Sequence, residues 1–157
     1  MAQITINVQK TALAALLGAI TGVTKVHEDR PAALQPRELP AFVLVPGPAR
    51  YAQRARGDNS VTVTRRWYAR LYVTESTKGR EFEAERAVDP FLTRVVDQLA
   101  QYPVVILSGG TAFSLSLDGG GDRGIVAPMP YADKDYAGSQ FEFDTVTEEY
   151  VTAIEEY

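Results

Sequence analysis

The chain has 157 residues, of which 45% are hydrophobic and 23% are charged, and this is the composition of an ordinary globular protein. It contains no cysteine and a single histidine, His27. Disulfides and thiolate chemistry, including Cys-His catalysis, are therefore excluded, Ser-His catalysis would have to use His27, and a zinc site is not expected. The length favours one domain, residues 1–157, with one hydrophobic core.

The net charge of −4 conceals a strong division along the chain. Residues 30–80 carry ten Lys and Arg against three acids, for a net charge of +7, while residues 81–157 carry four against fifteen, for −11. Such a chain can neutralise itself by pairing within one subunit, or it can pair head to tail with copies of itself. Both alternatives stay open at this stage.

Ile4–Val23 is predicted to be a helix with Gly22 as its C-cap. Its apolar residues recur at helical spacing: Leu13, Leu16, Leu17 and Ile20. A signal peptide is the alternative, but Lys10 lies ten residues in and no clear small-residue cleavage site follows. The longest apolar run, Thr11–Val23, is shorter than the roughly 20 residues of a membrane span.

The next stretch combines short apolar runs with breaks. Val23–His27 is predicted to be a short strand, followed by a connection that prolines interrupt. Ala41–Val45 is predicted to be a compact strand closed by a turn at Pro46-Gly47-Pro48. Arg50–Ser60 is polar, Arg-rich and without periodicity, so we predict an exposed loop that becomes ordered at an interface.

Val61–Glu75 is the most informative stretch. Its odd positions are mostly apolar and its even positions are polar or aromatic, so it is predicted to be one long strand. Fifteen residues at about 3.3 Å each span roughly 50 Å, twice or more the usual strand length. Such a strand is expected to project beyond its domain and meet a neighbouring chain. The alternative is a bulge or bend at Arg65-Arg66.

Arg80–Tyr102 carries a second helical pattern. The apolar stripe consists of Val88, Phe91, Leu92, Val95 and Leu99. Pro90 interrupts this pattern, so the helix either kinks there or begins there with Asp89 as its N-cap.

The following residues are predicted to alternate between strands and connections. Val104–Leu107 and Thr111–Leu117 are expected to be strands around a turn at Ser108-Gly109-Gly110. Asp118–Gly124 is expected to be a flexible connection. Ile125–Tyr136 contains two prolines and is expected to be irregular.

Ser139–Ile154 is predicted to be the last strand, with a bulge near Thr145–Thr147. It matches Val61–Glu75 in length and complements it in charge. Antiparallel pairing would place Trp67 and Phe143 on the core side. The same pairing would set three arginines against three acids, namely Arg65, Arg66 and Arg70 against Glu142, Asp144 and Glu148. The element order indicates an α+β fold, a mainly antiparallel sheet with two principal helices, Ile4–Val23 and Pro90–Tyr102, packed on one face.

No arrangement of residues indicates catalysis. Asp118 and Asp122 lack the spacing of an EF-hand, and the glycine-rich stretch lacks the GK[ST] of a phosphate-binding loop. Glu148 and Glu149 would point to opposite faces of a strand. We therefore expect no catalytic residue, no metal and no cofactor. The arginines with their aromatic neighbours suggest a nucleic-acid surface, but the chain is acidic and has no known reader motif.

The order of elements resembles the tail-terminator (tail-completion) proteins of long-tailed bacteriophages. An opening helix is followed by LPAFVLVPG at Leu39–Gly47, an Arg-rich loop and the long strand. A helix ending in PFLTRVVDQLA at Pro90–Ala100 and an acidic final strand extend the likeness over nearly the whole chain.

This resemblance implies a virion structural protein and not an enzyme. Such proteins form a homo-oligomeric ring, commonly a hexamer, that caps the last ring of the tail tube, ends its polymerisation and offers a surface for head attachment. The implied partners are other copies of the chain, the tail tube protein and the head–tail connector protein, with DNA passing non-specifically through the lumen and no membrane involved. The implied place is the head-proximal end of the tail, after assembly in the host cytoplasm.

Two alternatives remain: another head–tail joining or tube protein of the same particles, or a small ligand-binding or enzymatic α+β domain. The resemblance carries over no functional residue, so our interface hypothesis comes from the charge division. It sets the basic strand and loop region of one copy against the acidic half of the next. The residues are Arg50, Arg54, Arg56, Arg65, Arg66, Arg70, Glu142, Asp144 and Glu148.

Overall fold

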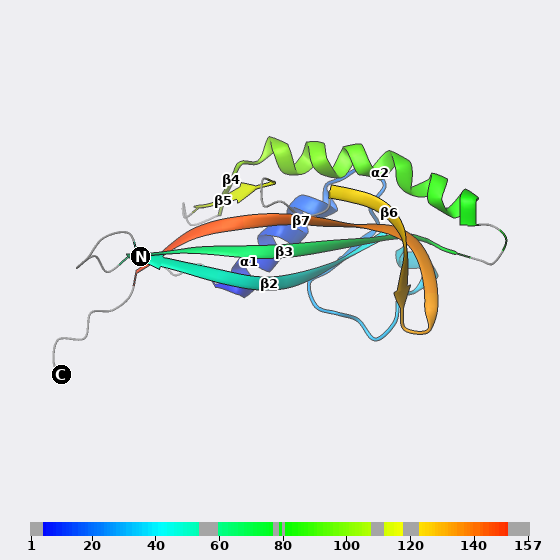
Figure 1. Ribbon diagram of the computed structural model, residues 1–157, viewed down its shortest axis with the longest axis horizontal. Coiled ribbons are helices and arrows are strands. Elements are labelled where there is room, and N and C mark those ends of the chain that lie inside the picture. Colours follow the sequence, from blue (N-terminus) through cyan, green and yellow to red (C-terminus); the bar gives the residue numbers. More distant parts are fainter. Residues whose placement is uncertain are drawn as a thin grey trace.

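The computed structural model describes residues 5–53, 60–76, 79, 81–107, 112–117 and 123–150. These residues form two α-helices, one 3₁₀-helix and a mostly antiparallel sheet, which confirms the α+β class (Figure 1). In chain order the elements are α1 (Ile6–Gly18), β1 (Lys25–His27), η1 (Pro36–Glu38), β2 (Ala41–Gln53), β3 (Ser60–Glu75), α2 (Glu81–Gln101), β4 (Val104–Ile106), β5 (Ala112–Ser116), β6 (Arg123–Tyr131) and β7 (Lys134–Tyr150). The strand order is β1-β2-β3-β7-β5-β4, and β6 pairs with β7 outside this path.

The antiparallel pair of β3 and β7 is the centre of the sheet. The register runs without a shift from Ser60 opposite Tyr150 to Tyr72 opposite Gly138. Trp67 lies opposite Phe143, and both are fully buried, which confirms the predicted pairing and its core side. The register shifts between Tyr72 and Thr74 instead of at the predicted positions near Arg65 or Thr145. The odd-numbered residues of β7 keep pointing inward through Thr145 and Thr147, which are buried with the apolar side chains.

Strand β2 is much longer than predicted. It continues through Pro46-Gly47-Pro48 to Gln53, and the expected turn is only a register shift against β3 between Pro46 and Ala49. Strand β1 pairs, in parallel, only with residues 41–43, so the prolines lie on an edge of the sheet, where a missing N–H is tolerated. Residues 50–53 are therefore strand and not loop, and residues 54–59 lie outside the described part of the chain.

The prediction of an irregular Ile125–Tyr136 is wrong. Most of this stretch belongs to β6, which forms a hairpin with β7 and begins within the predicted Asp118–Gly124 connection. Ala132 and Asp133 make the two-residue turn, with φ values of 46° and 68°. Among the described strands β6 pairs only with β7, so its two prolines again occupy an edge. The hairpin bends away from the long strands at the right of Figure 1.

Both helices differ from the predicted boundaries. Helix α1 starts after Thr5, whose hydroxyl accepts a hydrogen bond from the Val8 N–H, and it ends at Gly18 instead of Val23. Gly22, with a φ of 94°, lies in the turn before β1. Helix α2 is continuous across Pro90, so the alternative in which the helix begins at that proline is wrong.

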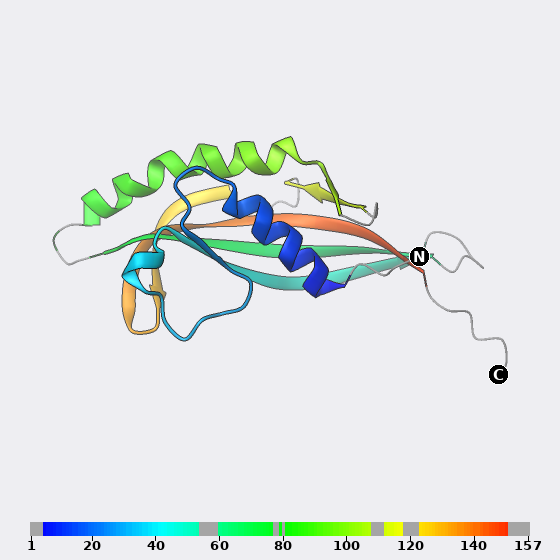
Figure 2. The same cartoon turned by 180° about the vertical axis from the view of Figure 1, so that it is seen from behind.

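Buried side chains form two clusters. The larger one joins residues of both helices to the central strands, including Leu17, Val88, Trp67 and Phe141. Figure 2 shows α1 lying across the sheet and α2 running along its upper margin. The smaller cluster, Leu34, Val43, Tyr72 and Tyr136, alternates with the larger one along the strands and so lies on the other face. Burial of each large apolar side chain contributes about 1.5–3 kcal/mol, so the larger cluster dominates the stability.

Candidate assembly interface

Arg66 is the centre of a charged network on the even-numbered face of β3 and β7. Its Nε donates to Asp144 Oδ1 at 2.6 Å, and its Nη1 donates to Glu142 Oε2 at 3.2 Å. The hydrogen bond to Asp144 is the main cause that raises the pKa of Arg66 above its usual value. The prediction that Arg66 would face these acids within the sheet is thus confirmed. These three charges are satisfied inside one subunit.

The network continues along the strands through a neutral group. Arg70 Nε donates to Gln140 Oε1 at 3.0 Å, and Gln140 Nε2 donates to Glu142 Oε1 at 3.2 Å. Arg70 lies opposite Gln140 in the β3–β7 register, not opposite an acid as predicted. The amide therefore connects Arg70 to the carboxylates around Arg66.

The prediction that Arg65 faces the acids of the last strand is wrong. Arg65 occupies an odd position opposite Thr145, on the same face as Trp67, and its Nη1 donates to the Gly47 carbonyl at 3.1 Å. A side chain on that face does not meet the row of acids, because successive residues of a strand point to opposite faces. Glu148 is exposed and lies opposite Thr62, not opposite an arginine.

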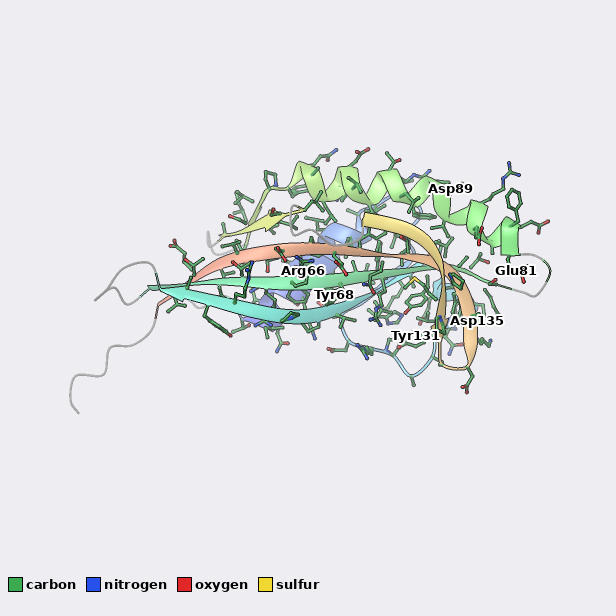
Figure 3. The ribbon with its side chains drawn as sticks, viewed as in Figure 1. Arg66, Tyr68, Glu81, Asp89, Tyr131 and Asp135 are labelled. Carbon is green, nitrogen blue, oxygen red and sulfur yellow. The ribbon has the colours of Figure 1, made fainter. Side chains whose placement is uncertain are left out.

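Three predicted interface arginines remain: Arg50, Arg54 and Arg56. Arg50 is exposed on β2, whereas Arg54 and Arg56 lie outside the described residues. A shallow cavity of about 350 Å³ opens beside Arg50 on this face. Its lining consists of Pro48, Arg50, Thr64, Arg66, Tyr68 and Asp144. Figure 3 shows Arg66 and Tyr68 on β3 in the middle of the sheet. The cavity holds both signs of charge, which suits a polar contact better than a reaction.

A second cavity, of about 340 Å³, lies between the start of α2 and the β6–β7 hairpin. Its lining includes Glu81, Glu85 and Asp135, and Figure 3 shows Glu81 and Asp135 at this end of the molecule. Hydrogen bonds from the backbone N–H groups of Glu81 itself and of Gly79 lower the pKa of the Glu81 carboxyl. Within the described ranges, no group of three or more His, Asp or Glu side chains is placed to hold a metal ion.

The single histidine is held in a structural pair. His27 Nε2 lies 3.1 Å from Glu38 Oε2. Partial desolvation acts to raise the pKa of Glu38, but the Gln35 N–H and the His27 side chain together lower it. His27 therefore helps to fasten the 3₁₀-helix η1 to β1.

Sequence reasoning missed a buried polar chain that ties α1 to the sheet. Trp67 Nε1 donates to Thr145 Oγ1 at 2.9 Å, and Thr145 Oγ1 donates to Gln9 Oε1 at 2.8 Å. Gln9 is 3% exposed. The spacing of Gln9 could have predicted its burial, because Gln9 precedes Leu13 by four residues and so lies on the apolar stripe of α1.

Sequence reasoning also missed an apolar surface between α1 and β4. Four large apolar side chains that line this groove are exposed: Val8, Tyr102, Val104 and Ile106. The groove has a volume of about 570 Å³ at its wider end, where its lining includes Val8, Ala12 and Ile106. A sequence pattern does not reveal such a surface, because exposure here depends on which element lies beside β4.

Neither helix of the described chain is long and apolar enough to cross a membrane. The geometry thus offers polar and apolar contact surfaces on an elongated sheet. In a comparison with known proteins, no protein-family model and no curated sequence matches this chain.

Proposed function

We propose that this chain is a tail terminator of a long-tailed bacteriophage. Its copies form a ring, a hexamer by resemblance, that caps the last ring of the tail tube, ends polymerisation and receives the head connector. The observation that carries the proposal is the length of the central strands, 16 residues in β3 and 17 in β7. Together with β2 they run past β4 and β5 to one end of the molecule (Figure 1). Strands of this length suit a subunit that spans the distance to its neighbours.

We infer that both helices lie over the same face of the sheet. This inference is supported by the larger buried cluster, in which residues of α1 and α2 pack with odd-numbered residues of β3 and β7. Neither α1 nor α2 then lies over the even-numbered face, which carries Arg66, Tyr68 and Glu142. In a ring, that face is available for the lumen or for a neighbouring subunit.

The charge division supports a head-to-tail contact, although less simply than the totals suggest. Arg66 already binds Glu142 and Asp144 within its own subunit, so these three residues fix strand register. The contact between copies is then assigned to three other basic residues of the first half of the chain, Arg50, Arg54 and Arg56. Their partners are acids in the second half of the next copy, among which Glu148 is exposed. Contacts of one surface with a different surface generate closed rings when the rotation closes.

Reversing the charges of Arg54 and Arg56 tests this assignment. The double variant Arg54→Glu with Arg56→Glu is expected to lose ring formation, measured by light scattering after size exclusion and by electron microscopy. The matched control, Arg30→Glu with Arg37→Glu, changes the net charge equally at two exposed positions before β2. Rings of the wild-type protein are also expected to weaken as salt rises, since ions screen exposed charges beyond about 10 Å at 0.1 M.

Circular dichroism separates assembly from folding, because charge reversals outside packed features usually change stability by less than about 0.5 kcal/mol. A folded Arg54→Glu, Arg56→Glu variant that still forms rings would show that these two arginines do not drive closure. Loss of rings in the control variant as well would assign the effect to net charge alone. A wild-type chain that forms no defined oligomer, alone, when concentrated or on tail tubes, would contradict the proposed function.

A further inference from the structure

The groove between α1 and β4 has the properties of a peptide-binding surface. Ile106 is 75% exposed and Val104 is 49% exposed, although both are large apolar residues. Strand β4 is the last strand in the sheet order, and no described strand pairs with its outer edge. An open strand edge beside an apolar groove favours the addition of an extended segment.

The described chain ends close to this groove. Val146 of β7 pairs with Ser114 of β5, which pairs with Val104 of β4, so these three residues lie at one level of the sheet. Continuing the register places Ile106 near the level of Glu148, just before β7 ends at Tyr150. Two strand spacings separate β7 from β4, about 10 Å.

The residues after β7 are apolar enough to fill such a groove. Residues 151–157 read VTAIEEY and include Val151, Ala153, Ile154 and Tyr157. Seven residues reach at most about 25 Å when extended. An extended segment of this length is long enough to lie along the groove.

The direction of the strands identifies whose groove these residues meet. Strand β5 is antiparallel to both β7 and β4, so β7 and β4 run toward the same end of the sheet. The end of β7 therefore points away from the groove of its own subunit. Returning would require a tight reversal, yet residues 151–157 contain no Gly, Pro, Asn or Asp, the residues that favour such turns. A neighbouring copy placed head to tail is reached without a reversal.

We propose that residues 151–157 of one copy bind the groove between α1 and β4 of the next copy. Val151 and Ile154 are the apolar anchors, and Val8 and Ile106 are the groove residues that receive them. This inference rests on the proposed ring and names an apolar contact that closes it. The contact is heterologous, so each copy gives one segment and receives another.

Disulfide trapping tests the contact directly, because the chain has no cysteine of its own. Ile106→Cys and Ile154→Cys are made in separate full-length chains, one of which carries a tag that changes its mass. The two chains are mixed under mild oxidation, both at high concentration and in cells that assemble tails. The expected product is a linked dimer of unequal masses, at least tenfold more abundant than with the control pair Phe82→Cys and Ile154→Cys. Phe82 is an equally suitable control because it is 68% exposed on α2, outside the groove.

Placing both cysteines in one chain shows whether the groove is filled by the segment of the same chain or by that of another copy. A ladder of linked chains supports binding between copies. An internal disulfide without linked chains overturns the inference, because the segment would then occupy its own groove. Equal linking by Phe82→Cys, or no linking in either setting, also overturns it.

Ending the chain at Tyr150 separates this inference from the proposed function. The shortened protein is expected to keep the circular dichroism of the full chain and to lose ring formation. Rings formed by the shortened protein would overturn the contact while the ring function still stands. Absence of rings from the full-length protein, in solution and on tails, would instead contradict the proposed function.

Discussion

Arg66 of β3 and Asp144 of β7 face each other in the strand register and are joined by a hydrogen bond of 2.6 Å between Nε and Oδ1. Only 22% and 14% of their side-chain areas are exposed, so solvent screens this pair less than a surface pair. A hydrogen bond between an arginine and a carboxylate is charge-assisted and short. Such a bond is specific as well as stabilising. The pair therefore helps to fix the register of the two longest strands.

Replacing Asp144 is expected to weaken the sheet. Asp144→Asn keeps the shape of the side chain but removes its charge, and it is expected to lower the free energy of unfolding by about 1–2 kcal/mol. Glu75→Gln is the matched control, because Glu75 lies 3.9 Å from Lys134 and both side chains are about half exposed. Its effect is expected to be under about 0.5 kcal/mol. Urea unfolding measures both, and equal effects would contradict the role of the Arg66 pair.

Two neighbouring threonines of β7 provide a sharper comparison. Thr145→Val leaves Trp67 Nε1 and Gln9 Oε1 buried without their common partner, so a loss of about 1–3 kcal/mol is expected. Thr147 is also buried, but its hydroxyl has no hydrogen-bond partner among the described residues. Thr147→Val is therefore expected to be neutral or stabilising. A larger loss from Thr147→Val than from Thr145→Val would show that the buried chain does not hold α1.

Gly138 is expected to tolerate no side chain. A Cβ at this position would lie 1.9 Å from the Leu71 carbonyl oxygen, at the place where the β3–β7 register shifts. Gly138→Ala is expected to lower the free energy of unfolding by about 3 kcal/mol or more, because backbone must move. Gly18→Ala is the control, since its Cβ would meet Val26 at an ordinary 3.7 Å and alanine favours a helix by up to about 1 kcal/mol. Thermal unfolding of both variants decides whether the close strand approach is essential.

Three tyrosines, two in the smaller cluster and Tyr131 packed against it, are expected to limit stability at high pH. Burial raises the pKa of Tyr72, Tyr131 and Tyr136 above the ordinary value of 10.0. The folded state then keeps these protons more tightly than the unfolded state, so stability is fully present below about pH 10 and falls as the pH rises through it. Tyr136→Phe is expected to make this fall shallower, measured by urea unfolding from pH 8 to 11. Tyr51→Phe is the control because Tyr51 is 66% exposed, and an equal change in both variants would contradict the assignment.

The central strand pair was predictable because the signal for it is local. Trp67 and Phe143 lie in long alternating stretches, and alternation fixes the face of each residue once the strands pair. Proline misled the prediction at Pro46 and Pro128, because a proline ends a strand only where its missing N–H matters. Both residues lie on edges of the sheet. The sequence of a strand does not show which other strands pair with it.

The candidate interface was predictable only in part, for a similar reason. Arg66 met its predicted acids, but Arg65 was grouped with it by charge although alternation already placed it on the other face. Ile106 appeared as an ordinary strand residue. Its 75% exposure follows from the position of β4 at the end of the sheet, which only the three-dimensional arrangement gives.

The length of tails assembled without this protein tests the central proposal most directly. Electron microscopy of particles from which the chain is deleted is predicted to show tubes longer than normal and separated from heads, because nothing ends polymerisation or receives the connector. Supplying the wild-type chain in trans is predicted to restore both length and attachment. Tails of normal length joined to heads in the absence of the chain would contradict the tail-terminator proposal.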